Sequence, residues 1–214
     1  LRAVDGVRIA DKTVLKMMNE MGLRCGIRRE TDYRRCNSYR GEVGETFENV
    51  IGRDLAADGP WQKMGTDVTE FKLSFGKAHL APVYDFGSKE IVAHSISMHP
   101  DLAQQEEMLG MLLAAKPEGA RPVLHSDMGW QYQHAAYVGA LAENGFVQSM
   151  SRKGNCLDNG ATEQVFGHLK DEFFRGRDWD TFEGFKADLE SYIHHWNNVR
   201  RQVKLKGKSE AKRS

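Results

Sequence analysis

The 214-residue sequence lacks several features that define other classes of protein. Its three cysteines, Cys25, Cys36 and Cys156, are odd in number and lack metal-ligand spacing, which argues against a zinc site and fits a reducing cytosol. No apolar run approaches the length of about 18 residues that a membrane-spanning helix needs. The N-terminus shows no charged-then-apolar signal segment, and it opens at Leu1 rather than at a methionine, as expected of a fragment.

The formal net charge is zero, but the charges are unevenly distributed. Residues 1–40 carry 10 Lys and Arg against 5 Asp and Glu, and residues 199–214 carry 7 against 1. The middle, 41–198, carries 13 against 24. Basic ends around an acidic centre suit a protein whose ends hold the phosphate backbone of DNA and whose centre holds cations. A pair of solvated basic tails explains the ends equally well.

The hydrophobic pattern predicts one main α/β domain over 61–200. Strands are expected at 64–75, 78–86, 90–98, 123–125 and 146–150. Helices are expected at 101–116, 134–144, 161–175 and 181–200. Three consecutive strands favour an antiparallel meander, whereas the strand-helix alternation that follows favours parallel crossovers. We therefore predict a mixed five-stranded sheet of order 3-2-1-4-5, with helices on both faces.

Ahead of this domain, residues 1–23 are expected to form a small, partial helix-turn-helix-like segment. Its helix is predicted over 11–22, with Asp11 as N-cap and an apolar stripe formed by Val14, Leu15, Met18 and Met21. Residues 24–60 have no periodic pattern and are interpreted as a basic arm or linker. Residues 201–214 are interpreted as a basic tail.

Three carboxylates are placed to meet in space. Asp67 lies within the first predicted strand, Asp127 follows the fourth, and Glu163 lies in the first turn of a helix, with 35 residues between it and Asp127. In the predicted sheet the two aspartates are on neighbouring strands, and sites gather where the strand order changes. Clustered carboxylates repel one another unless a cation lies between them, and oxygen ligands suit Mg²⁺ or Mn²⁺. Singly, each acid is explained as a surface, turn or helix-terminal residue.

Several motifs resemble those of one family. HSDMGWQY at 125–132 resembles the HSD-x-G-x-QY signature of bacterial insertion-sequence transposases with a retroviral-integrase-like catalytic core. The stretch SMSRKGNCLDNGATEQVFGHLKDE at 149–172 is similar to the family's SMSR-x-GN-C-x-DN segment and glutamate-bearing helix. TDVTEF at 66–71 resembles the segment with the first aspartate. Residues 11–24 and 192–202 are similar to the preceding helical region and the closing helix.

The resemblance implies an RNase H-like fold and metal-dependent cutting and joining of DNA at the ends of a mobile element. It makes Asp67, Asp127 and Glu163 the catalytic and metal-binding residues of a DDE site that holds two Mg²⁺ or Mn²⁺ ions. The partners it implies are element and target DNA, a second copy of the chain, and a helix-turn-helix protein from an upstream reading frame. The expected location is the bacterial cytoplasm, in association with the nucleoid.

Further residues are candidates for supporting roles. Lys170 lies two helical turns after Glu163, on the same helix face, where it can reach a phosphate or the terminal bases. The other expected DNA contacts are Gln131, Arg152, Lys153, Asn155 and Asn159, although the amides can equally cap turns and Asn159 can cap the helix. Residues expected to support the site are His125, Gly129 and Tyr132, with a buried core histidine as the alternative for His125. Asp158, Asp171 and Glu172 are interpreted as surface acids.

One departure from the family lies near the C-terminus. The family continues with a Leu-x-Gly-x-Ser-Pro segment, whereas here Leu205-Lys206-Gly207-Lys208-Ser209 is followed by Glu210. Two alternatives to an active transposase therefore stay open. One is an RNase H-like nuclease without strand transfer, and the other is a decayed remnant that binds DNA without turnover.

Overall fold

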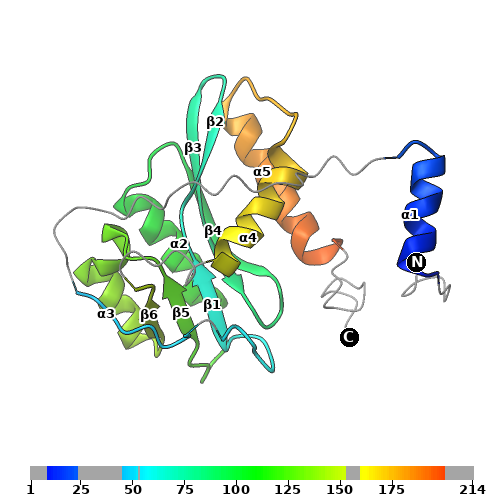
Figure 1. The fold of residues 1–214 in the computed structure, drawn as a ribbon. Helices are drawn as coiled ribbons and strands as arrows, with labels where there is room; N and C mark the ends of the chain where they lie inside the picture. The colour runs from blue at the N-terminus through cyan, green and yellow to red at the C-terminus, as the bar shows by residue number, and fades with distance from the viewer. Residues whose placement is uncertain (1–8, 24–44, 53, 153–159, 201–214) are drawn as a thin grey trace.

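The computed structural model describes residues 9–23, 45–52, 54–152 and 160–200. Six strands form one sheet (Figure 1): β1 (Lys63–Thr66), β2 (Thr69–Leu73), β3 (Gly76–Asp85), β4 (Ile91–Ser97), β5 (Val123–Ser126) and β6 (Val147–Met150). The order is β2-β3-β1-β5-β6, and β4 pairs with the other edge of β3. β1, β2 and β4 are antiparallel to β3, whereas β1, β5 and β6 are mutually parallel. The predicted mixed sheet and its order are confirmed.

The sheet has six strands rather than five because the first predicted strand is interrupted at Asp67 and Val68. The Asp67 carboxylate accepts a hydrogen bond from the Val68 N–H at 2.8 Å. Both pieces nevertheless keep one register against β3, since Thr66 pairs with Val83 and Thr69 pairs with Leu80. β1 and β2 are therefore one strand in direction, with a local break at the first candidate carboxylate.

Helices cover both faces of the sheet (Figure 1). They are α2 (Leu102–Ala115), α3 (Ala135–Glu143), α4 (Gly160–Leu169) and α5 (Phe182–Asn198), with a short 3₁₀ helix η1 (Trp130–Gln133) after β5. The helix predicted over 161–175 changes type at Lys170, where a single π-helical turn, η3 (Lys170–Phe174), begins. N-terminal caps fix α2 and α5, because the side chains of Asp101 and Thr181 accept backbone N–H groups.

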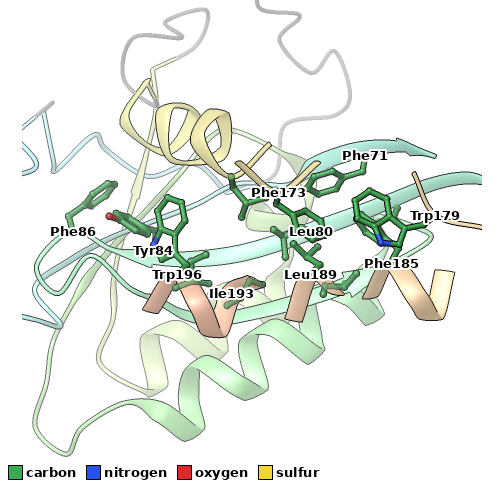
Figure 2. Packing of buried hydrophobic residues seen from close by; sticks show 14 residues of the cluster. Phe71, Leu80, Tyr84, Phe86, Phe173, Trp179, Phe185, Leu189, Ile193 and Trp196 are labelled. Atoms are coloured by element: carbon green, nitrogen blue, oxygen red, sulfur yellow. The ribbon is translucent and has the colours of Figure 1, made fainter. Parts of the chain in front are cut away.

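The two sheet faces have separate apolar cores. One core joins β2 and β3 to η3 and α5 through Phe71, Leu80, Phe173, Phe185 and Trp196 (Figure 2). The other core lies under α2 and α3 and includes Met64, Val83, Met108, Leu112 and Leu141. Alternate residues of a strand point to opposite faces, so the same strands serve both cores.

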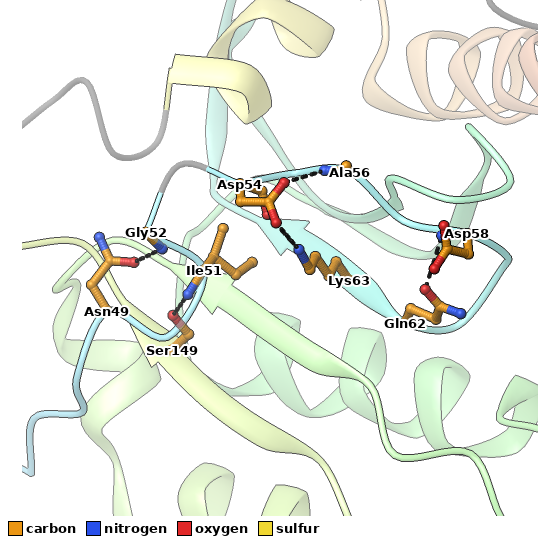
Figure 3. Close-up of polar contacts among 9 residues, drawn as sticks. All are labelled: Asn49, Ile51, Gly52, Asp54, Ala56, Asp58, Gln62, Lys63 and Ser149. Carbon is orange, nitrogen blue, oxygen red and sulfur yellow. Dashed lines mark hydrogen bonds and ion pairs between the residues drawn. The ribbon is translucent and has the colours of Figure 1, made fainter.

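Residues ahead of β1 pack on the sheet. Ile51 is buried, and its N–H and that of Val50 donate to the Ser149 hydroxyl on the edge strand β6 (Figure 3). Lys63 bonds the Asp54 carboxylate at 2.9 Å. Contacts with the core thus begin before Trp61. The division of the chain into segment, arm, core and tail stays a prediction.

In the N-terminal helix α1 (Asp11–Glu20), Ala10 is at the N-cap position, so the predicted N-cap Asp11 is wrong and Asp11 is instead the first helical residue. Its apolar stripe is only partly covered within the described residues, because Leu15 and Met21 are 56% and 62% exposed. Within the described ranges, no helix has both the length and the apolar character needed to cross a membrane.

Candidate active site

The first two carboxylates lie side by side at the ends of parallel strands. In the register of β1 with β5, Gly65 is opposite His125. Two residues further on, Asp67 and Asp127 hold equivalent positions just beyond the two strands. Neighbouring strands are about 4.8 Å apart, and residues two apart point to the same face. The sheet therefore brings the two aspartates together on the face that α4 covers.

The electrostatics of Asp67 agree with this geometry. The pKa of its carboxyl is raised from 3.8 to about 7, first by burial and second by the neighbouring charge of Asp127. Glu163 also raises the pKa of Asp67, whereas the Val68 N–H and Lys170 lower it. The Asp67 carboxyl, at the strand break, is therefore within electrostatic range of both Asp127 and Glu163.

Asp127 is oriented by the backbone that follows it. Its carboxylate accepts the Gly129 N–H at 2.8 Å, which favours the charged form, while burial raises its pKa. A Cβ atom on Gly129 would lie 2.6 Å from the Gln131 amide nitrogen, so the end of the Gln131 side chain lies directly over this glycine. The predicted supporting residue Gly129 thus contacts Asp127 through its backbone.

The helix that carries Glu163 is seated directly on β1. A Cβ atom on Gly65 would lie 2.5 Å from the Thr162 hydroxyl and 2.8 Å from the Phe86 ring. Thr162 is buried, whereas Glu163 beside it is exposed. Partial burial raises the pKa of Glu163. The absence of a side chain at position 65 therefore lets the first turn of α4 approach the strand that leads to Asp67.

Lys170 lies near the same point from the far end of α4. Its ammonium is 5.4 Å from the centroid of the Phe71 ring on β2. Burial lowers the pKa of this lysine, and the charges of Glu70 and Asp67 oppose that change. A partly buried cation beside a carboxylate pair is placed to bind a phosphate that approaches the acids.

The donor set fits divalent cations of the magnesium type. Two carboxylates with raised pKa values lie together where a cation would replace the proton, and Mg²⁺ and Mn²⁺ prefer such oxygen ligands. Among the described residues, no three His, Cys, Asp or Glu side chains are close enough together to hold one ion. The assembled part of the site is therefore the aspartate pair, with Glu163 beside it.

His125 lies one row below the carboxylates on the same sheet face. It is buried, and its ring nitrogens bond the hydroxyls of Ser149 at 2.9 Å and Ser151 at 3.1 Å. Ser149 already accepts the N–H groups of Val50 and Ile51, so its hydrogen is directed at Nδ1. The histidine is therefore the Nε2–H tautomer, and these bonds join β5 to β6 beneath the site.

Tyr132 lies on the opposite sheet face. It is fully buried, and its hydroxyl has no hydrogen-bond partner of ordinary geometry among the described residues. Burial raises its pKa well above 10, and the charges of Asp67 and Asp127 act in the same direction. Its nearness to both carboxylates is consistent with the predicted supporting role.

The predicted DNA contacts are only partly described. Gln131 is half-buried beside Gly129, and Arg152 is exposed at the end of β6. Lys153, Asn155 and Asn159 lie outside the described residues. Glu172, expected to be a surface acid, is instead engaged in a partly buried ion pair with Arg200.

Two features of the site were missed in the sequence. Trp130 is 38% exposed at the start of η1, three residues after Asp127. A tryptophan inside a short polar motif was the available signal. The second missed feature is Gly65. Nothing in the local sequence pattern shows that the helix containing Thr162, 97 residues later, packs against this position.

Comparisons with known proteins identify the family of this chain. Residues 57–156 and 163–212 match the family described as Integrase core domain. An uncharacterised transposase-like protein of Haemophilus influenzae is 44% identical over 203 residues, covering 95% of this chain and 92% of that protein. The putative transposase InsK for insertion sequence element IS150 of Escherichia coli strain K12 is 41% identical over 203 residues, covering 95% and 70%.

The chain belongs to the insertion-sequence transposases with an integrase core. This transposase core also resembles solved retroviral integrases. A chain of the simian T-cell lymphotropic virus intasome aligns with a TM-score of 0.58 at 16% identity, over 78% of this chain and 58% of that one. The catalytic core of HTLV-2 integrase aligns with a TM-score of 0.51 at 16% identity, over 72% and 95%. The predicted RNase H-like fold is confirmed, and the family function is DNA transposition by an integrase-like core.

Proposed function

We propose that this transposase core cleaves the 3′ ends of its element and transfers them to target DNA. The observation that carries the proposal is the equivalent placement of Asp67 and Asp127 on two parallel strand ends, with Glu163 acting on the same point. Membership of the transposase family makes DNA the substrate. Asp67, Asp127 and Glu163 are the catalytic residues in this proposal.

The three carboxylates would hold two Mg²⁺ or Mn²⁺ ions. When bound, such ions activate a water or 3′-hydroxyl nucleophile and stabilise the leaving oxygen. The chain's own residues prepare the site, because the Gly129 N–H orients Asp127 and the Val68 N–H orients Asp67. The HTLV-2 integrase core, solved in complex with magnesium, supports this choice of metal.

DNA would be held beside the carboxylates by residues of several segments. Lys170 is placed to bind a phosphate next to Asp67, and the exposed Trp130 offers a surface on which an unpaired base can stack. Gln131 and Arg152 flank the same strand ends. Lys153, Asn155 and Asn159 stay predictions of the same kind.

Joining two element ends requires two active sites, so we propose a dimer or larger assembly on paired ends. The intasome and the trimeric integrase core among the structural neighbours support assembly as a property of this fold. A helix-turn-helix protein from an upstream reading frame stays a proposed partner. Cleavage and strand transfer would take place on nucleoid DNA in the bacterial cytoplasm.

A strand-transfer assay tests the function. The probe is a labelled duplex carrying the element's end sequence with a free 3′-hydroxyl, incubated with the full chain, Mg²⁺ and plasmid target. Joined products are expected from the wild type. Asp127→Asn removes one carboxylate charge and should abolish both cutting and joining, while Glu106→Gln on the exposed side of α2 should leave both unchanged.

The alternatives give different products. Shortened strands without joined ones would support a nuclease, and retention on DNA with neither product would support an inactive remnant. Full activity in Asp127→Asn would show that the catalytic residues have been misassigned.

A further inference from the structure

The helix that carries Glu163 and Lys170 ends in an unusual turn. From Lys170 to Phe174 the chain is π-helical, and the turn is closed by the Arg175 N–H donating to the Lys170 carbonyl at 3.0 Å. π-helices are rare and occur mostly as single turns within α-helices. Lys170 is the residue at which the hydrogen-bonding register changes, and because the π form is rare we expect contacts outside the turn to stabilise it.

The apolar side of the turn is fixed by aromatic packing. Phe173 is fully buried and stacks on Trp179 with ring centroids 5.1 Å apart (Figure 2). Phe174 stacks on the same ring at 5.8 Å. The extra residue of the π turn lets both neighbouring phenylalanines face the core. Since these rings are anchored, closing the turn to an α-helix would rotate α4 by about 100° relative to them. Lys170 would then leave its place beside Asp67.

The polar side of the turn is fixed by Arg200. Its guanidinium forms two bonds with the Glu172 carboxylate, at 2.8 and 2.6 Å, and the Tyr192 hydroxyl donates to the same carboxylate at 2.8 Å. These bonds hold the pKa of Glu172 below its ordinary value, with the Arg200 bond as the first cause. Bidentate, charge-assisted pairs of this kind fix geometry as well as adding energy.

Arg200 is itself anchored to the far side of the fold. Its guanidinium lies 4.1 Å from the Trp196 ring centroid, and the Trp196 ring donates to the Lys89 carbonyl. Next to it, Asn197 completes the edge of β4 with two bonds to the Ile91 backbone. The end of α5 is thus a rigid support from which Arg200 reaches η3.

We propose that Glu172, Arg200 and Tyr192 form a clasp that keeps the π turn open and so positions Lys170 beside the carboxylate pair. These three are positioning residues in this proposal, since they act through Lys170. The inference rests on the proposed role of Lys170 in holding DNA. It adds two residues from the closing helix region to the machinery of the site.

The test measures DNA binding without chemistry. The full chain is titrated with a fluorescein-labelled duplex at several salt concentrations in EDTA, so that metal binding at Glu163 does not contribute. Lys170→Ala should lower the slope of log K against log salt by about 1, as expected for the loss of one phosphate contact. Glu172→Gln and Arg200→Gln should each reproduce that change while leaving Lys170 in the sequence.

Two comparisons separate positioning from general destabilisation. Asp171→Asn removes a second ion pair of the same turn, the 2.9 Å bond to Arg175, and should leave the slope unchanged. Combining Glu172→Gln with Lys170→Ala should give no further loss beyond Lys170→Ala alone, because both changes remove one contact. Thermal unfolding of every variant checks that the aromatic anchors still hold the fold.

Each outcome is decisive. Clasp variants that keep the wild-type slope, or whose effect adds fully to that of Lys170→Ala, would overturn the positioning role, as would a Lys170→Ala variant with no effect. A wild-type chain that fails to bind the duplex at all would instead contradict the proposed function.

Discussion

Replacing Asp67 by asparagine should stabilise the metal-free protein, although it removes a catalytic residue. Burial and the charge of Asp127 hold the pKa of Asp67 at about 7, against an ordinary value of 3.8. Between these pH values the folded protein keeps a proton that the unfolded chain has released. The unfolded state then binds fewer protons, so the free energy of unfolding of the wild type falls as pH rises. Asparagine has no such titration.

The magnitude follows from the shift. A change from 3.8 to about 7, at about 1.36 kcal/mol per pH unit, amounts to about 4 kcal/mol of lost stability once the pH is above 7. The Asp67 carboxylate accepts the Val68 N–H at 2.8 Å, and the side-chain oxygen of asparagine can accept the same bond. The substitution therefore removes the charge and keeps this hydrogen bond. The gain of Asp67→Asn should therefore approach this upper value above pH 7 and vanish near the ordinary pKa.

Urea unfolding in EDTA at a series of pH values measures the difference. Adding Mg²⁺ should stabilise the wild type by mass action, because the ion replaces the proton, and should stabilise Asp67→Asn much less. Asp180→Asn, at an exposed position before α5, serves as the control and should follow the wild type at every pH. Equal free energies of unfolding for wild type and Asp67→Asn above pH 7 would refute the reasoning about burial and repulsion.

Two further changes probe the same site. Gly65→Ala should cost about 1–3 kcal/mol of stability in thermal unfolding, since the new methyl would overlap Thr162 and Phe86, and it should lower joining by displacing the start of α4; unchanged joining would contradict that link. Trp130→Ala should weaken binding to single-stranded DNA by about 1–3 kcal/mol in an anisotropy titration, as for the loss of one stacked base, whereas Trp130→Phe should keep most of the affinity. A loss of equal size in both variants would argue against stacking.

Much of the architecture was predictable because periodicity and motif spacing are local properties. The strand order and the helices on both faces follow from the order of elements, and that order makes Asp67 and Asp127 neighbours. The break in the first strand was not predicted. At the break the Asp67 carboxylate accepts the Val68 N–H, a bond that the hydrophobic pattern does not reveal.

The contacts around Glu172 also could not be predicted from the sequence. In the sequence it is one of several acids after Glu163, with no feature that marks it. Its partners Tyr192 and Arg200 come 20 and 28 residues later, and their direction depends on how α5 packs on the aromatic core. Distance along the chain gives no information about such pairs.

The sequence was enough to identify the transposase family and the RNase H-like order of strands, and to predict three acids as the catalytic residues, because these depend on residue type and spacing. The folded chain was needed to show that Asp67 and Asp127 share one register. It also showed that Gly65 leaves room for the first turn of the glutamate helix and that a π turn begins at Lys170 and is bonded through Glu172 to Arg200. Each of these depends on the approach of segments far apart in the chain, where a missing Cβ atom or one extra residue in a turn sets the position of a charge.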